Sequence, residues 1–161
     1  MIRVLFICLG NICRSPMAEF VFKDMVNKRG IAGEFEIASA ATSDEECWNG
    51  RGNPVYPPAQ AELRRHGIGV PANELGLSKK RARQITRDDY DRWDLIIAME
   101  QNNLRGIRRI VGEDTENKVK LLLDYTDCPG DIADPWYTGD FGGVYRQIVA
   151  GCEGLLKHLD F

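Results

Sequence analysis

The chain has 161 residues, of which 43% are hydrophobic and 28% charged, as in one ordinary globular domain. Its net charge of -3 excludes the basic footprint of a nucleic-acid-binding protein, so an anionic substrate needs a local positive site. No apolar run is long enough to span a bilayer, and the short apolar start lacks an A-x-A-like cleavage site. We therefore expect one cytoplasmic domain over residues 1–161, with no membrane insertion and no nucleic acid as a partner.

Apolar runs of strand length alternate with segments of helical periodicity. The nearly continuous apolar run at residues 2–7 predicts a strand that is buried on both faces. Ser15 and Pro16 then indicate the start of a helix, and Gly30 indicates its end. Further strands are predicted at residues 34–38, 95–99 and 119–123. Further helices are predicted at residues 58–66 and 102–111, and a last helix carries an apolar stripe over residues 144–159.

The order of these elements points to a binding site. Strands that alternate with helices indicate parallel β-α-β units with helices on both faces of the sheet. In such a fold, ligands bind beyond the carboxyl ends of the strands. The loop after the first strand is therefore the first candidate. A second long loop is predicted over residues 124–140, which contain two prolines and two glycines.

The loop after the first strand has the features of a phosphate-binding loop. It leads from a buried strand into a helix start, so its amide groups converge at the positive end of the helix. Gly10 and Asn11 tolerate backbone conformations that other residues avoid. The predicted phosphate-binding residues are Leu9, Gly10, Asn11, Ile12, Cys13 and Ser15.

Two residues of this loop can perform phosphate-ester chemistry. Cys8 lies at the strand end, where oriented amides and a guanidinium favour a thiolate that can attack phosphorus. Arg14 offers a planar fork that matches two phosphate oxygens, and Ser15 can donate its hydroxyl to the sulfur. A lone cysteine at a strand end is more often a small buried hydrophobic residue, but the surrounding strand, loop and helix start favour the catalytic role. This chemistry needs no metal and no other cofactor.

Asp134, in the long loop before the last helix, is the candidate general acid. Pro135 restricts Asp134 to extended conformations, and Trp136 and Tyr137 can wall a slot for an aromatic leaving group. An apolar wall and a bound phosphate dianion both favour the protonated carboxyl that a general acid requires. Alone, this stretch would indicate only an Asp-Pro turn. Beside the Cys8 loop it predicts acid catalysis.

Residues 8–16 and residues 134–137 together resemble the low-molecular-weight protein tyrosine phosphatase family, and the similarity covers nearly the whole chain. Both motifs in their proper order are highly specific. Further matching segments are residues 17–19, 39–43, 52–54, 66–68 and 99–103. The resemblance implies a single α/β domain with three layers, like the Rossmann and flavodoxin folds. In it, a four-stranded parallel sheet is flanked by helices on both faces, and the phosphate loop follows strand 1.

The resemblance also implies an activity, which is the metal-independent hydrolysis of phosphotyrosine in proteins and of small aryl phosphates through a cysteinyl-phosphate intermediate. It assigns Cys8 as nucleophile, Arg14 as transition-state clamp and Asp134 as the acid that later acts as base toward water. The implied partners are a phosphotyrosine-containing protein and a phosphate or other oxyanion in the active site. We expect a monomer or a weak homodimer.

Supporting roles follow from the same resemblance. Asn11 is expected to order the loop through hydrogen bonds that reach Ser15 and His66, although His66 can equally cap the end of its own helix. Trp48, in a glycine-rich segment after the second strand, is the candidate for an aromatic pocket wall that faces the aromatic pair of the acid loop. The alternative for Trp48 is a side chain packed under a loop.

Cys13 is the candidate redox partner of Cys8. In the family a neighbouring thiol can form a reversible disulfide that protects the nucleophile from over-oxidation. The alternative is a loop filler whose backbone amide alone matters. The chain has five cysteines, an odd number, and free thiols are expected in a reducing compartment. Cys152 lies in the apolar stripe of the last helix and is expected in the core.

The chain departs from the family pattern near the expected pocket rim. Ala41 replaces a common glycine, and Tyr56 and Pro58 stand where the family usually has aspartate and arginine. Trp136 replaces a more frequent tyrosine and keeps an aromatic ring in the slot. These departures concern substrate preference rather than the chemistry.

Other classes of protein fit the sequence less well. An arsenate reductase of the same fold also has the Cys-x5-Arg-Ser loop, but it needs resolving thiols that residues 75–95 lack. A non-catalytic phosphate-binding regulator would be indicated by a missing nucleophile or acid, and both groups are present here. A dinucleotide-binding oxidoreductase is excluded because Gly10 stands alone, without a G-x-G-x-x-G motif.

Overall fold

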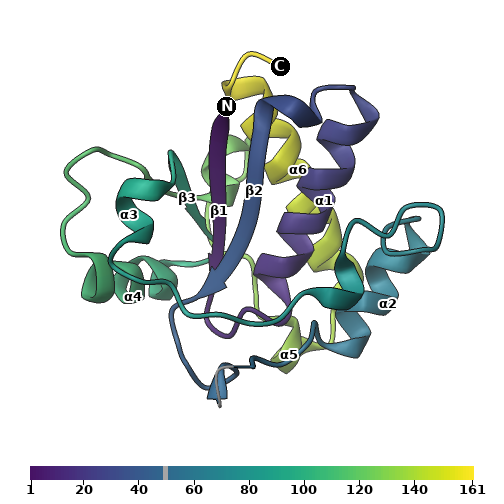
Figure 1. Ribbon diagram of the computed structural model, residues 1–161, viewed down its shortest axis with the longest axis horizontal. Helices are drawn as coiled ribbons and strands as arrows, with labels where there is room; N and C mark the ends of the chain where they lie inside the picture. The colour runs from purple at the N-terminus through teal and green to yellow at the C-terminus, as the bar shows by residue number, and fades with distance from the viewer. Residues whose placement is uncertain (49–50) are drawn as a thin grey trace.

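The computed structural model describes residues 1–48 and 51–161 of the chain. Within these residues, four parallel strands form one sheet in the order β2-β1-β3-β4, which confirms the predicted α/β fold. The strands are β1 (Ile2–Cys8), β2 (Phe35–Ala41), β3 (Leu95–Ala98) and β4 (Val119–Leu121). Helices α1 (Arg14–Lys28), α2 (Pro57–Arg65) and α6 (Phe141–His158) cover one face, and α3 (Asp89–Arg92) and α4 (Gln101–Val111) lie on the other (Figure 1).

The central strand β1 alternates its side chains between two hydrophobic cores. Val4, Phe6 and Cys8 belong to the core shared with α1 and α6, whereas Leu5 and Ile7 belong to the core shared with α4. None of these five side chains is more than 3% exposed. The continuous apolar run of this strand therefore reflects burial on both faces.

The chain reverses its direction of winding at β1, which pairs with β2 on one side and with β3 on the other. At such a switch point the connections after neighbouring strands diverge and leave a crevice beyond their carboxyl ends. In Figure 1 the loop after β1 and helix α5 (Pro135–Thr138) lie at this lower end of the sheet, and both termini lie at the opposite end.

Strand β2 is longer than predicted. It runs to Ala41 because the segment that follows η3 (Leu77–Lys79) passes along its outer edge. Ala41 N donates to Arg83 O at 2.7 Å, and Ile85 N donates to Ala41 O at 2.8 Å. A second chain segment thus supplies the hydrogen bonds that hold the end of β2 extended. At the other end, β2 follows the short helix η1 (Ala32–Glu34).

Strand β4 is shorter than predicted, because it ends at Leu121 and the 3₁₀ helix η4 (Leu122–Tyr125) follows. Leu122 is fully buried against α6 at Gly151, where an added Cβ would lie 2.4 Å from Leu122 Cγ. The apolar run that predicted a strand over residues 119–123 therefore includes a turn that packs on a helix. The loop predicted over residues 124–140 contains the single turn of α5.

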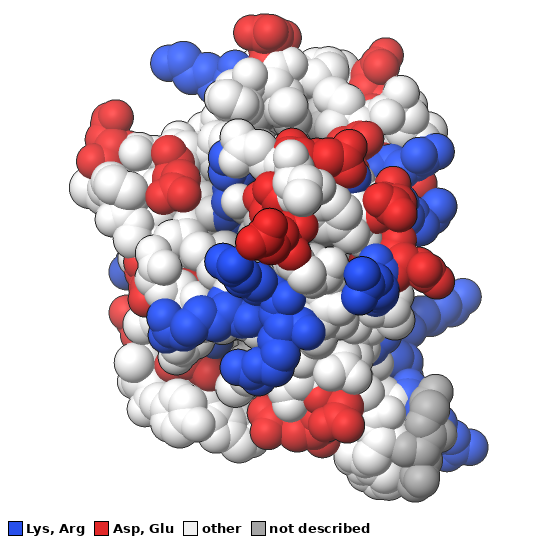
Figure 2. Space-filling model, turned by 90° about the vertical axis from the view of Figure 1, so that its left-hand side faces the viewer, with Lys and Arg blue, Asp and Glu red and all other residues white. Residues whose placement is uncertain are grey.

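Positive charge gathers on one face of the molecule (Figure 2), although the net charge of the chain is -3. Figure 2 shows Lys and Arg side chains grouped in the middle of the face that carries α3 and α4, with acidic side chains above and below them. The exposed arginines of α4 are Arg105, Arg108 and Arg109. Among the helices that the structure describes, none combines the length and the apolar character needed to traverse a membrane.

Candidate active site

The loop between β1 and α1 places the Cys8 sulfur against polar hydrogens. Cys8 is 3% exposed, and its Sγ lies 3.0 Å from Ser15 Oγ and accepts a hydrogen bond from Asn11 N at 3.3 Å. Asn11 adopts a φ of 59°, which turns its amide back toward the sulfur. The N-terminus of α1 adds its positive dipole end at the same point. These contacts are those that stabilise a thiolate.

The side chain of Asn11 orders the loop from behind. Its Nδ2 donates to Ser15 Oγ at 2.8 Å and to Ser39 Oγ at 2.9 Å, and its Oδ1 accepts from Arg83 N at 3.2 Å. Because Ser15 Oγ accepts this bond, its own hydrogen is free to point at the sulfur of Cys8, as a thiolate requires. The expected bond between Asn11 and Ser15 is therefore present.

The hydrogen-bond network continues from Ser39 to Glu19 and Lys80, two residues that the sequence analysis did not assign to it. Ser39 Oγ donates to Glu19 Oε1, and Lys80 Nζ donates to Ser39 O at 2.9 Å. Lys80 Nζ also lies 3.5 Å from Glu19 Oε1, and burial lowers the pKa of Lys80. The signals that could have identified this network are a serine inside an apolar strand and a glutamate inside a buried helix face.

His66 does not belong to this network, so the expectation that Asn11 would reach it is wrong. His66 Nε2 lies 2.9 Å from Glu62 Oε2, and its ring stacks on Tyr145 at a centroid distance of 3.8 Å. These contacts join α2 to α6 at a distance from the loop. The matching sequence motif located this helix end correctly but not the direction of the side chain.

Arg14 is fixed beneath the cleft by acceptors from two other loops. It is 2% exposed, and its Nη1 donates to Glu100 Oε2 at 2.7 Å and to Ile132 O at 2.9 Å. Its Nη2 lies 3.4 Å from Asp134 Oδ2. Burial lowers the pKa of this guanidinium, but Cys8, Glu100 and Asp134 outweigh that effect and the net pKa is raised. Arg14 is therefore a permanent cation in the lining of the cleft that Cys8 also lines.

Glu100 is a functional candidate that the sequence analysis missed. It follows the buried strand β3 and caps the start of α4, where its N–H donates to Asn103 Oδ1 at 3.0 Å. The rule that places ligand sites beyond the carboxyl ends of parallel strands applies to this position as well as to the loop after β1. The position of Glu100 directly after a predicted buried strand was the signal from which its role could have been inferred.

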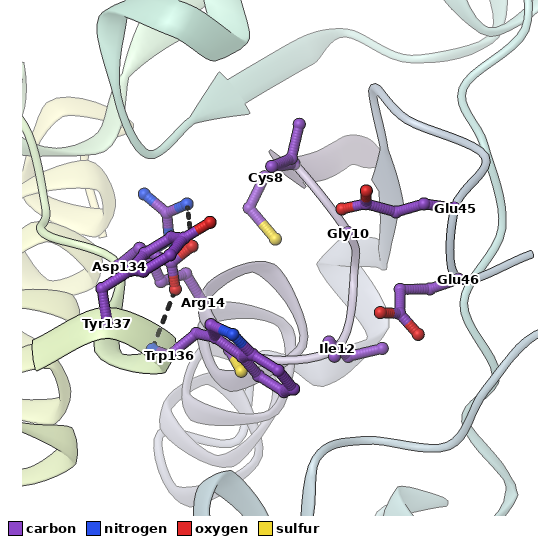
Figure 3. Close-up of a pocket in the computed structure, with 11 residues that line it drawn as sticks. Cys8, Gly10, Ile12, Arg14, Glu45, Glu46, Asp134, Trp136 and Tyr137 are labelled. Carbon is purple, nitrogen blue, oxygen red and sulfur yellow. Dashed lines mark hydrogen bonds and ion pairs between the residues drawn. The ribbon is translucent and has the colours of Figure 1, made fainter. Parts of the chain in front are cut away.

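Asp134 stands over the cleft at the N-terminus of α5, as the sequence predicts for the acid loop. Its Oδ1 accepts from Trp136 N at 3.0 Å, which leaves Oδ2 directed toward Arg14 and the cleft (Figure 3). Trp136 and Tyr137 are 54% and 81% exposed and line the same cleft. Tyr56 packs against Trp136 at a centroid distance of 4.7 Å, so one of the departures from the family pattern buttresses this aromatic wall.

The cleft has a volume of about 250 Å³, large enough for an aryl phosphate, and its base is the phosphate loop. Its lining brings together most of the predicted site residues, which are Cys8, Leu9, Gly10, Ile12, Cys13, Arg14, Asp134, Trp136 and Tyr137. Within residues 1–48 and 51–161, no three His, Cys, Asp or Glu side chains are placed to hold a metal ion.

Trp48 is not among the cleft residues, so the structure does not support its expected role as a pocket wall. It is 63% exposed and lines a different hollow, together with Arg51, Asn53 and Arg81. The wall opposite the aromatic pair is formed by Glu45 and Glu46 instead. The glycine-rich segment of that prediction extends into residues 49–50, which lie outside the described residues.

Cys13 lies in the cleft lining and is 5% exposed. Burial raises the pKa of its thiol strongly, and the neighbouring Cys8 and Asp134 raise it further. A thiol with a raised pKa is a poor nucleophile at neutral pH. Of the two thiols in the loop, only the sulfur of Cys8 is contacted by a hydroxyl and a backbone amide within the described residues. The five cysteines of the chain, including Cys152 in the core, are unpaired.

A buried sulfur held by an amide and a hydroxyl, in one cleft with a fixed guanidinium and a carboxyl group, is the arrangement of a cysteine-dependent phosphatase. Comparisons with known proteins agree. The family model for low molecular weight phosphotyrosine protein phosphatase matches residues 3–160. The chain therefore belongs to the low molecular weight phosphotyrosine protein phosphatase family.

Individual relatives resemble this chain over nearly their full length. The low molecular weight protein-tyrosine-phosphatase YfkJ of Bacillus subtilis is 42% identical over 99% of this chain and 96% of its own. The low molecular weight phosphotyrosine protein phosphatase of Homo sapiens is 39% identical over 96% of this chain and 93% of its own. The crystal structure of YfkJ superimposes with a TM-score of 0.88 over 99% of this chain and 95% of its own. The crystal structure of SP-PTP, a low molecular weight protein tyrosine phosphatase from Streptococcus pyogenes, superimposes with a TM-score of 0.83. It is 36% identical and the match covers 99% of this chain and 93% of its own.

Proposed function

We propose that this protein hydrolyses phosphotyrosine in proteins, and small aryl phosphates, by two successive displacements at the sulfur of Cys8. The observation that carries this proposal is the position of Cys8 Sγ, which lies 3.0 Å from Ser15 Oγ and 3.3 Å from Asn11 N at the base of a cleft. Family membership supports the same activity.

In the first displacement, the phosphoryl group binds over the loop amides and Arg14, and the Cys8 thiolate attacks phosphorus. The bond from phosphorus to the tyrosine oxygen breaks as the bond to sulfur forms. Protonated Asp134 gives its proton to the departing phenol oxygen. The products of this step are tyrosine, a cysteinyl phosphate and an ionised Asp134.

In the second displacement, Asp134 takes a proton from a water molecule whose oxygen attacks phosphorus. The sulfur leaves as a thiolate, which the Ser15 hydroxyl stabilises by hydrogen bonding, and inorganic phosphate is released. Arg14 spans the equatorial oxygens in both transition states because its guanidinium is held in place by Glu100.

Trapping of the intermediate tests this mechanism. After reaction with p-nitrophenyl phosphate and a denaturing quench, intact-mass measurement should find one added phosphoryl group on the wild type and on a Cys128→Ser control, since Cys128 is exposed and outside the cleft. A Cys8→Ser variant should carry no label and still bind vanadate. Label that persists in Cys8→Ser, or activity that a chelator abolishes and Mg²⁺ restores, would overturn the mechanism.

Location and assembly belong to the same proposal. Five unpaired cysteines, two of them at the site, suit the reducing cytoplasm. The exposed Trp136 and Tyr137 offer an apolar rim for weak self-association, so we expect a monomer or a weak homodimer. Sedimentation velocity across a range of protein concentrations would separate the two.

A further inference from the structure

The wall of the cleft that faces the aromatic pair is acidic. Glu45 and Glu46, from the loop after β2, line the cleft across from Trp136 and Tyr137 (Figure 3). A tyrosyl phosphate that enters between these walls therefore meets aromatic rings on one side and two carboxylates on the other. Arg14 and the loop amides hold the phosphate itself, so the two carboxylates act on the residues that flank the phosphotyrosine.

The acidic wall is tied to the phosphate loop by hydrogen bonds. Ser43 N donates to Leu9 O at 3.0 Å, and Glu45 N donates to Ser43 Oγ at 3.1 Å. Asn53 N donates to Glu46 O at 2.8 Å, and Asn53 Nδ2 donates to the Glu46 carboxylate. The backbone of this segment and the Glu46 carboxylate are therefore held relative to the phosphate loop, while the Glu45 carboxylate is exposed.

Neither glutamate forms an ion pair within the part of the chain that the structure describes. None of its lysine, arginine or histidine nitrogens lies within 4.0 Å of the Glu45 or Glu46 carboxylate oxygens. Asp44 precedes them and adds a third acidic residue to the segment. The exposed arginines of α4, Arg105, Arg108 and Arg109, do not contribute to the lining of the cleft. A cationic side chain of a bound substrate can therefore reach the exposed Glu45 and the half-buried Glu46.

We propose that Glu45 and Glu46 select phosphotyrosine segments that carry a lysine or arginine next to the phosphotyrosine. The cationic side chain lies along the acidic wall while the tyrosine ring packs on Trp136 and the phosphate occupies the Cys8 loop. A segment with glutamate or aspartate at the same position meets like charges and is rejected. This inference rests on the proposed function, since it assigns a substrate preference to the same cleft.

Matched peptides test it. Three phosphotyrosyl peptides that differ only in the flanking residue, arginine, glutamine or glutamate, are compared by kcat/KM at low and high salt. An ion pair at the rim of the cleft should raise kcat/KM of the arginine peptide about five-fold over that of the glutamine peptide. This difference should become smaller as salt is added. The order expected for the wild type is arginine, then glutamine, then glutamate.

Three variants identify the residues responsible. The double variant Glu45→Gln/Glu46→Gln should remove the order, and Glu45→Lys should shift the preference toward the glutamate peptide. Glu34→Gln serves as the charge-matched control, because Glu34 is exposed before the start of β2, at the opposite end of the sheet. It should retain the wild-type order.

The outcomes also separate this inference from the mechanism. Wild-type turnover of p-nitrophenyl phosphate with equal kcat/KM for all three peptides would refute the acidic-wall proposal alone. Loss of the order in Glu34→Gln would likewise refute it, by showing a general charge effect. Failure of the wild type to turn over p-nitrophenyl phosphate would instead refute the proposed function.

Discussion

Replacement of Asn11 is the most informative perturbation of the loop, because its side chain makes three hydrogen bonds and its backbone is left-handed. The amide donates to Ser15 and Ser39 and accepts from Arg83 N, and the residue is 1% exposed at a φ of 59°. In Asn11→Ala the three partners lose their hydrogen bonds to this side chain. The backbone of the alanine is also forced into a left-handed conformation, with no side-chain hydrogen bond to stabilise it.

The magnitude follows from these contacts. Three buried hydrogen bonds at about 1 kcal/mol each give about 3 kcal/mol. The left-handed conformation adds about 1 kcal/mol for alanine, whereas glycine adopts it without that strain. We expect Asn11→Ala to lower the free energy of unfolding by about 4 kcal/mol and Asn11→Gly by about 3 kcal/mol. Turnover should fall in both variants because the Ser15 hydroxyl is no longer directed at Cys8.

Urea denaturation of the two variants and the wild type measures these differences, provided that the slope of the unfolding transition is unchanged. A double-mutant cycle with Ser15→Ala isolates the single bond between the two side chains, for which we expect a coupling of about 1 kcal/mol. Equal stability of the alanine and glycine variants would show that φ at this position is not strained. A loss below about 1 kcal/mol in Asn11→Ala would contradict the network itself.

Three further predictions concern the acid, pH dependence and packing. Asp134→Ala should slow phenyl phosphate about 10²–10⁴-fold in kcat, and slow an ester of a strongly acidic phenol far less, since that leaving group needs no proton. The pKa of Asp89 is lowered overall, because although burial raises it, hydrogen bonds from Arg83, Thr86 and Trp93 outweigh that effect. The stability that Asp89 contributes is therefore present above its unfolded pKa and is lost as the pH falls through its lower folded value. In urea denaturation at pH 7, Asp89→Asn should lower the free energy of unfolding by about 2 kcal/mol. At a pH below the folded pKa of Asp89, the variant and the wild type should be equally stable. Gly151→Ala in α6 should destabilise by about 1–3 kcal/mol, because its Cβ would meet Leu122 Cγ at 2.4 Å, whereas Gly142→Ala in the same helix meets nothing closer than 3.5 Å.

Each of these predictions has an outcome that contradicts it. Equal slowing of both esters would remove Asp134 from the acid role. If the stability difference for Asp89→Asn stayed constant from pH 7 to acid pH, the carboxylate would not be the source of that stability. Equal melting of the two glycine variants would show that Leu122 can move aside at little cost.

The predictions from the sequence that succeeded concern groups that are contiguous in the chain. The strand, the phosphate loop and the helix start occupy residues 2–28 without interruption, so their order alone places Cys8 and Arg14 at one end of the sheet. The acid loop likewise carries Asp134, Trp136 and Tyr137 within one short segment. Local conformation suffices for such motifs once the sheet is known to be parallel.

What the sequence did not predict depends on side chains that meet from separate segments. Ser39 reaches the phosphate loop from β2, and Lys80 reaches Ser39 from the segment beside β2. Nothing in the spacing of the chain specifies these contacts. Trp48 lies outside the cleft and is 63% exposed, and the side chain of His66 points away from the phosphate loop because neighbouring residues offer other partners. For His66 those partners are Glu62 and Tyr145.

The contacts of Arg14 divide between an anchor and the cleft. Its Nη1 lies 2.7 Å from Glu100 Oε2 and also donates to Ile132 O at 2.9 Å, whereas its Nη2 lies 3.4 Å from Asp134 Oδ2. The two shorter contacts hold the guanidinium plane in place, and the longer one belongs to the carboxyl group that lines the cleft. In the proposed reaction, a phosphate that binds Arg14 therefore replaces the contact with Asp134 and leaves the anchor to Glu100 and Ile132 intact. The same buried arginine can thus receive the phosphoryl group without losing the orientation that a bidentate contact requires.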